Sequence, residues 1–136
     1  MKVDDNSLPT DSSYHTFQVA LDSAAKQFGR IMNIGPLHRQ HLRDAGFEDI
    51  VQDKRKVPLS PWPKNPQQKE LGRYMQMQML DAVESYGLAP LTRILGWDTT
   101  RVQVLIAGVR QDLRTRDYHM YSNWFVSDSA LFGCYV

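Results

Sequence analysis

Apolar residues recur at helical spacing in three long stretches of the chain. These stretches cover residues 14–28, 66–86 and 99–114. Positions three and four apart share one face of a helix, so each stretch is predicted to form a helix with one apolar face. In the last stretch that face consists of Val102, Leu105, Ile106, Val109 and Leu113. Helices therefore dominate the predicted fold.

Single glycines follow the predicted helices, where glycine is favoured because it adopts the left-handed conformation that closes a helix. They are Gly29, Gly46, Gly87 and Gly96. They also delimit two shorter predicted helices, over residues 36–45 and 88–95. Cap-forming residues precede the first and last long helices, namely Ser12 or Ser13 and Asp98 or Thr99.

Two segments have the composition of β-strands. Residues 47–59 contain Ile50 and Val57, but residues 52–56 between them are polar or charged. A strand buried on both faces is apolar throughout, so we expect this one near the edge of a sheet. Residues 118–126 are rich in aromatic residues and form the second predicted strand.

The pattern as a whole predicts one mostly helical domain over residues 1–136, with a small sheet of two or three strands. Its parts are a loop (1–13), helices (14–46), a strand (47–59), a helical cap (66–114), a strand (118–126) and a tail (127–136). A third short strand is possible in the tail, at residues 131–132 or 134–136.

Composition narrows the class of protein. The 16 basic and 15 acidic residues leave a formal charge of +1, which does not favour a nucleic-acid partner. The longest apolar run, residues 104–109, is far shorter than the roughly 20 residues of a membrane span. The single cysteine, Cys134, cannot form a disulfide within the chain. We expect a soluble intracellular protein, cytoplasmic or nuclear, without a membrane partner.

His119 is the candidate catalytic residue. It opens the last predicted strand between Tyr118 and Tyr121, where it can serve as a general base or a substrate contact if that end faces a pocket. The alternative is a partly buried structural histidine, which is the commoner role for such a residue.

Tyr74, Met75, Met77 and Tyr121 are the candidate substrate-binding residues. Methionines line adaptable apolar pockets, and three of them alternate near Tyr74 on one predicted helix. Core packing is the competing explanation for such a stripe.

Metal and cofactor sites are not predicted. His38, His41 and Asp44 have a spacing that can hold a metal, but a solvated helix face is the favoured interpretation. Asp4 and Asp5 can form a paired-carboxylate site, although capping of the N-terminal loop is favoured. The glycines are scattered singly and form no glycine-rich phosphate loop, so no cofactor-binding residue is assigned.

Short motifs in a fixed order carry a family resemblance. They are Asp4-Asp5-x-Ser7-Leu8-Pro9, Ala45 to Ile50, Lys56 to Leu59, Trp62-Pro63-Lys64, Lys69 to Gly72, Gly96-Trp97, Val109 to Leu113, and His119 with Tyr121. Their order resembles the C-terminal half of the fungal LaeA-like family of S-adenosylmethionine-dependent methyltransferases, which is associated with secondary metabolism. The resemblance extends to about residue 122, and the tail departs from the ending usual in the family.

The resemblance implies the C-terminal part of a doubly wound class I methyltransferase fold with a helical substrate cap. The family's glycine-rich loop and acidic residue, which hold S-adenosyl-L-methionine, would lie in the half that this chain lacks. The two strands would flank an inner strand that is also missing. We therefore expect a homodimer, or a partner protein that covers the open sheet edge.

The implied function is that of a truncated methyltransferase-family protein that is not a competent methyltransferase alone. Three alternatives remain open. The first is a cofactor-independent binding or cyclase-type protein, whose cap encloses a small apolar secondary metabolite. The others are a regulatory remnant that binds a partner protein and an inactive gene product.

Overall fold

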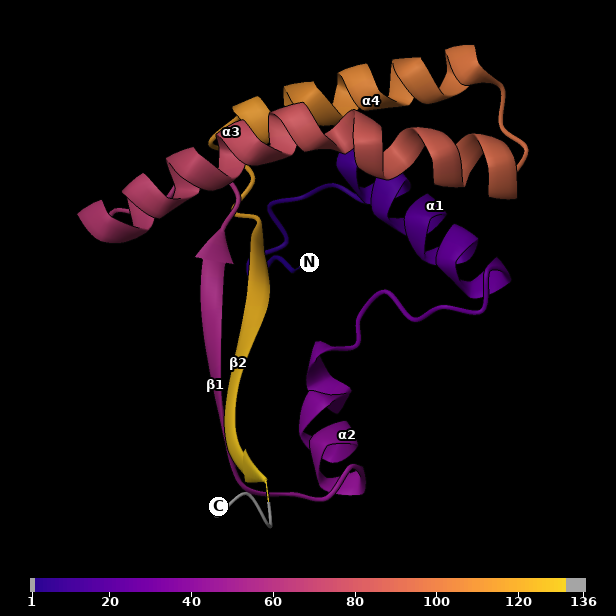
Figure 1. Ribbon diagram of the computed structural model, residues 1–136. Helices are drawn as coiled ribbons and strands as arrows, with labels where there is room; N and C mark the ends of the chain where they lie inside the picture. Colours follow the sequence, from indigo (N-terminus) through magenta and orange to yellow (C-terminus); the bar gives the residue numbers. More distant parts are fainter. Residues whose placement is uncertain (1, 132–136) are drawn as a thin grey trace. The chain divides into compact units, whose positions relative to one another are not determined.

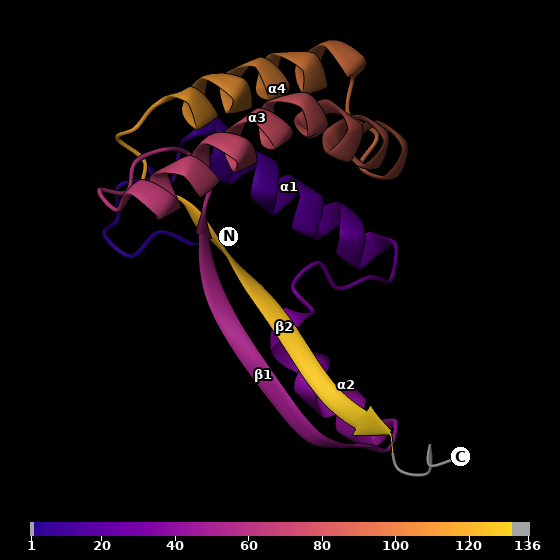
Figure 2. The ribbon, with the colours of Figure 1, turned by 60° about the vertical axis from the view of Figure 1, so that its left-hand side comes forward.

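Three helices form the body of the protein in the computed structural model, which describes residues 2–131. They are α1 (Ser13–Gln27), α3 (Pro66–Ala89) and α4 (Thr99–Arg114). Helices α3 and α4 pack along one another, and α1 packs against α4 (Figures 1 and 2). A π-helical turn, η2 (Pro90–Ile94), follows α3 and contacts all three helices.

The chain divides into two compact units within what the sequence predicts to be one domain. The first combines residues up to 32 with residues 57–122, and so contains α1, α3 and α4. The second combines residues 33–56 with the residues from 123 onward. It contains η1 (Gly35–Leu37), α2 (His38–Asp44) and most of the two strands.

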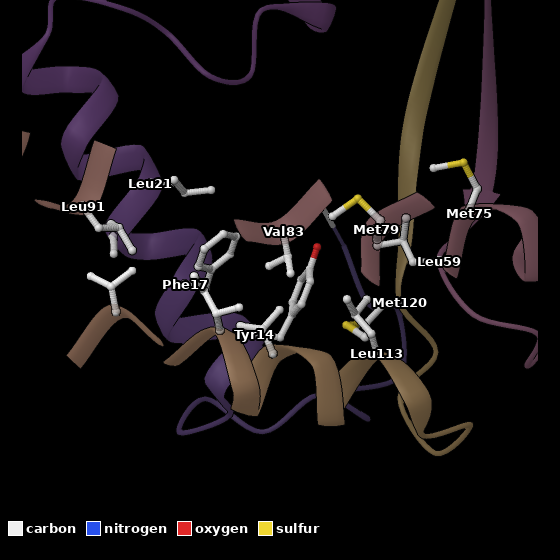
Figure 3. Packing of buried hydrophobic residues seen from close by; sticks show 14 of the residues in the cluster. Tyr14, Phe17, Leu21, Leu59, Met75, Met79, Val83, Leu91, Leu113 and Met120 are labelled. Carbon is white, nitrogen blue, oxygen red and sulfur yellow. The ribbon is translucent and has the colours of Figure 1, made fainter. Parts of the chain in front are cut away.

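The core of the first unit lies where the three helices meet. Figure 3 shows Tyr14 and Phe17 of α1 inserted between α3 and α4, beside Val83. Leu59 and Met120, from the chain next to the strands, complete the cluster near Leu113 (Figure 3). Burial raises the pKa of the Tyr14 phenol above its ordinary value.

Each of the three long helices begins with a side-chain cap, and the sequence predicts the caps of α1 and α4. The Ser12 hydroxyl accepts a hydrogen bond from the His15 backbone N–H at 3.2 Å. The Asp98 carboxylate accepts from the N–H groups of Thr100 and Arg101, and the Asn65 side chain caps α3 in the same way. Gly29, Gly46 and Gly96 have φ angles of 70°, 87° and 67°, which confirms their predicted place at helix ends.

Gly87 does not end a helix, so the prediction of a break there is wrong. Helix α3 continues through Gly87 to Ala89 and passes directly into η2, in place of a separate helix over residues 88–95. A Cβ atom at Gly87 would lie 2.5 Å from the Phe17 ring. The glycine is needed for close packing between α3 and α1, a contact that no local sequence pattern reveals.

The two strands pair directly in a two-stranded antiparallel sheet (Figure 1). Strand β1 (Phe47–Pro58) matches the prediction, and β2 (Tyr121–Leu131) begins later and extends further than predicted. Residues 127–131 are therefore strand, not tail, because β2 continues to pair with β1 beyond its aromatic segment. Residues 132–136, including the possible short strand there, lie outside the described part of the chain.

The expectation that the two strands flank a missing inner strand is wrong, since β1 and β2 are hydrogen-bonded neighbours. The antiparallel pair is compatible with a fragment of a methyltransferase fold, and a doubly wound sheet is not seen in residues 2–131. No helix within these residues is both long enough and apolar enough to span a membrane.

Candidate functional site

The N-terminal segment lies against the start of β2 through a short antiparallel bridge. The backbone N–H of Lys2 donates to the Tyr121 carbonyl at 2.9 Å, and the Tyr121 N–H donates to the Lys2 carbonyl at 3.1 Å. A further bond joins the His119 N–H to the Ser7 hydroxyl at 2.9 Å. Because these bonds fix the segment at both ends, its two aspartates are held beside the residues that open β2.

Asp5 is the partner of His119. Its Oδ2 atom contacts the Nδ1 atom of the imidazole, while its Oδ1 atom accepts a hydrogen bond from the Ser7 backbone N–H at 3.1 Å. The bond with His119, followed by those with Ser7, lowers the pKa of Asp5 from 3.8 to about 2. Asp5 is therefore an ionised carboxylate at neutral pH.

An ionised carboxylate only accepts hydrogen bonds, so the Nδ1 atom of His119 must carry the proton that joins it to Asp5. In the neutral imidazole, Nε2 then has the free lone pair. Within residues 2–131, Nε2 has no hydrogen-bond partner, and the His119 side chain is 42% exposed. This arrangement leaves a basic nitrogen open to an incoming molecule.

Trp62 covers part of the imidazole. The two ring centroids are 4.9 Å apart, and the ring planes meet at 37°. The indole N–H donates to the Met120 carbonyl at 3.0 Å, and the same carbonyl accepts from the Leu59 N–H. The proline-rich corner after β1 thereby holds the indole in place, which limits the orientations open to His119.

Tyr121 is linked to the second aspartate of the N-terminal segment. Its hydroxyl donates to the Asp4 Oδ1 atom at 2.6 Å, and the residue is only 5% exposed. The structure therefore brings Asp4, Asp5 and Ser7 together with Trp62, His119 and Tyr121. We call these six residues the Asp5–His119 cluster.

Sequence comparison connects the chain to fungal methyltransferases and regulators. It is 32% identical over 126 residues to methyltransferase pytC of Aspergillus terreus, covering 93% of this chain and 39% of pytC. It is 35% identical over 123 residues to a secondary metabolism regulator of Cochliobolus heterostrophus, covering 90% of this chain and 40% of that protein. The protein-methionine methyltransferase laeA of Emericella nidulans is 26% identical over 121 residues, which are 89% of this chain and 32% of laeA.

The chain belongs to the LaeA-like methyltransferase family. It spans about two fifths of the length of pytC and of the Cochliobolus regulator, in keeping with the resemblance to one part of these proteins. No family model matches the chain, and no solved structure matches it either.

The family implies dependence on S-adenosyl-L-methionine, but the glycines of the LaeA-like chain do not fit the loop that holds such a cofactor. Its eight glycines form no glycine-rich loop of the kind that cradles a nucleotide-like ligand. Three of those in the described region, Gly72, Gly87 and Gly108, are close-packing positions inside helices. No chemical step is therefore assigned to a cofactor held by this chain.

The predicted substrate-binding residues of α3 do not all face the same side of the helix. Helix α3 turns Met75 into the core and leaves Tyr74 and Met77 at 60% and 61% exposure. The fourth, Tyr121, is engaged with Asp4 in the Asp5–His119 cluster. A role in substrate binding stays a prediction for all four.

The histidines of α2 are not part of a metal-binding arrangement within residues 2–131. No group of three or more His, Cys, Asp or Glu side chains there is placed to hold a metal ion. Asp44, which the sequence spacing adds to His38 and His41, accepts a hydrogen bond from the Gln40 side chain at 2.7 Å.

Sequence reasoning named His119 and Tyr121 but missed their partners. It interpreted Asp4 and Asp5 as loop caps and gave Trp62 no role at the site. One signal was available, because the Asp-Asp-x-Ser motif and the His119–Tyr121 motif both belong to the family resemblance. Two motifs at opposite ends of a domain are candidates for a shared site.

Proposed function

We propose that the LaeA-like chain forms the substrate side of an S-adenosylmethionine-dependent methyltransferase of secondary metabolism, with His119 as its general base. The family membership supports the reaction class. The observation that carries the proposal is the Asp5–His119 pair, which leaves Nε2 as the open basic nitrogen. Asp5 acts as a positioning residue, since it works through the imidazole.

The proposed chemistry is removal of a proton from the methyl acceptor. Nε2 of His119 takes the proton from an acceptor O–H or N–H, which makes the acceptor atom a stronger nucleophile. With a methyl donor present, the acceptor would bond to the methyl carbon as the bond between that carbon and the donor sulfur breaks. The ionised carboxylate of Asp5 stabilises the resulting imidazolium. A positioned general base of this kind contributes roughly 10²- to 10⁴-fold in rate.

We also propose that the chain alone does not bind the methyl donor. Its sequence provides no glycine-rich loop for the donor. Isothermal titration calorimetry of the whole chain with S-adenosylmethionine tests this part of the proposal. We expect no measurable binding, and a dissociation constant in the micromolar range would overturn it.

A second candidate is a regulatory role through a partner protein, which is favoured because several relatives are named secondary metabolism regulators. In this proposal a partner, or a second copy of the chain, covers the outer edge of β2. Size-exclusion chromatography with light scattering tests the second-copy version. A dimer supports it, whereas a monomer at all concentrations contradicts it.

A further inference from the structure

An apolar groove runs along one side of the helical unit. Its walls come from α1, from the residues that follow α1, from α3 and from η2, and its volume is about 510 Å³. The main apolar residues that line it are Phe17, Leu21, Phe28, Met79, Tyr86 and Ile94. None of the groove residues belongs to the Asp5–His119 cluster.

The groove has a buried floor and an exposed rim. Phe17, Leu21 and Met79 form the floor, and each is at most 8% exposed. At the rim, Phe28 and Tyr86 are 67% and 52% exposed. Covering apolar surface of this kind is favourable because it removes that surface from water.

The size and lining are those of a small-molecule site. Ligand pockets commonly measure about 300–1,000 Å³, with mostly apolar walls and a few polar groups that orient the ligand. In this groove the polar groups are the Gln18 amide, the Arg30 guanidinium and the Tyr86 hydroxyl, and Arg30 is the charged one. The Gln18 amide is already directed at the Tyr14 hydroxyl, at 3.5 Å, and Arg30 is the cation that can pair with an acidic group of a ligand.

Arg30 is placed at the groove by the end of α1. Gly29, with a φ of 70°, turns the chain, and the Arg30 N–H donates to the Ala25 carbonyl at 2.8 Å. The Arg30 guanidinium has no ion-pair partner within residues 2–131. A cation beside an apolar groove selects a ligand that has an acidic group at one end.

We infer that this groove binds a flat, largely apolar small molecule that carries one acidic group. The ring system lies on Phe17, Leu21 and Met79, and the acidic group pairs with Arg30. The inference is independent of the proposed function, because it uses neither His119 nor a methyl donor.

Two fluorescent naphthalene compounds that differ in one acidic group test the inference. The anion is 1-anilinonaphthalene-8-sulfonate, and its neutral counterpart is N-phenyl-1-naphthylamine. We expect both to bind the whole chain at one site, with the anion binding more tightly. Saturation at one molecule per chain supports a single groove, whereas a stoichiometry well above one overturns it.

Charge reversal at Arg30 separates the acidic contact from the apolar one. We expect Arg30→Glu to weaken the anion roughly three- to tenfold and to leave the neutral compound within about twofold. The matched control is Arg116→Glu, an exposed arginine outside the groove. Equal effects of the two variants on the anion would overturn the role of Arg30.

Filling the groove tests where the ring system lies. Ala25 lines the groove, and Ala25→Phe places a ring in the proposed ligand space. We expect this variant to weaken both compounds by about tenfold or more, with circular dichroism confirming an unchanged helix content. Tyr86→Lys, at the exposed rim, serves as a second variant and weakens the neutral compound. The inference is overturned if both variants bind the two compounds as wild type does. It is also overturned if ultracentrifugation shows a wild-type dimer that dissociates in Tyr86→Lys, because a second copy would then cover the groove.

Discussion

The Nδ1 atom of His119 meets the Oδ2 atom of Asp5, although the two residues are 114 positions apart in the chain. Ser7 supports both partners, since its N–H donates to Asp5 and its hydroxyl accepts from the His119 backbone. The relationship gives the imidazole a defined orientation on a 42% exposed side chain. An exposed histidine without such support would sample several rotamers and both tautomers.

Asp5 is expected to make stability depend on pH in the acid range. Its pKa is about 2 in the folded chain and 3.8 without its partners, so the ionised form stabilises the fold above pH 3.8. That contribution is lost as the pH falls from about 3.8 towards 2. We expect the melting temperatures of wild type and Asp5→Asn to differ at pH 5 and to converge near pH 2.

Circular dichroism melting between pH 2 and pH 7 measures this convergence. Asp81→Asn, at an exposed position of α3, controls for the loss of one negative charge. A constant difference between wild type and Asp5→Asn over the whole range would show that Asp5 is not stabilised by its partners.

The hydroxyl of Tyr121 is expected to stabilise the fold through Asp4. A hydrogen bond to a charged group contributes about 1.5–3 kcal/mol, and this one lies at a partly buried position. We expect Tyr121→Phe to lower the free energy of unfolding by about 1–2 kcal/mol in urea titrations. Tyr74→Phe is the matched control, since Tyr74 is 60% exposed, and should change it by less than about 0.5 kcal/mol. Similar values for the two variants would contradict the Asp4 contact.

Gly87 is expected to resist replacement even though it lies inside a helix. Alanine raises helix propensity by about 1 kcal/mol relative to glycine, but its Cβ would lie 2.5 Å from the Phe17 ring. Overpacking of this kind destabilises by about 1–3 kcal/mol, so we expect Gly87→Ala to unfold at lower urea concentration than wild type. Ser85→Ala, at an exposed position of the same helix, is the control. A stabilised Gly87→Ala would show that close packing against Phe17 does not require a glycine at this position.

Local features account for most of what the sequence predicted correctly. The bounds of α4 follow from its apolar periodicity and from Asp98, because both the stripe and the cap act within one helix. The left-handed glycines at the ends of α1 and α2 are local in the same sense.

Contacts between distant residues account for what the sequence did not reveal. Contact with Phe17 explains why a glycine lies within α3 at position 87, and pairing with β1 explains why β2 includes the polar residues 127–129. The Asp5–His119 cluster is the clearest case. Its members come from three separate segments, and nothing in the spacing of any one segment places Asp5 or Trp62 beside His119.

The imidazole nitrogens of His119 offer the most direct test of the proposed base. Two-dimensional ¹H–¹⁵N spectra distinguish the two tautomers of the neutral ring, and His15, on α1, provides an internal comparison. In the neutral ring of wild-type His119 we expect the proton on Nδ1, which faces Asp5. In Asp5→Ala the His119 ring should shift towards the Nε2-protonated form, while His15 stays unchanged. A neutral wild-type ring with its proton on Nε2, or no response to Asp5→Ala, would contradict the account.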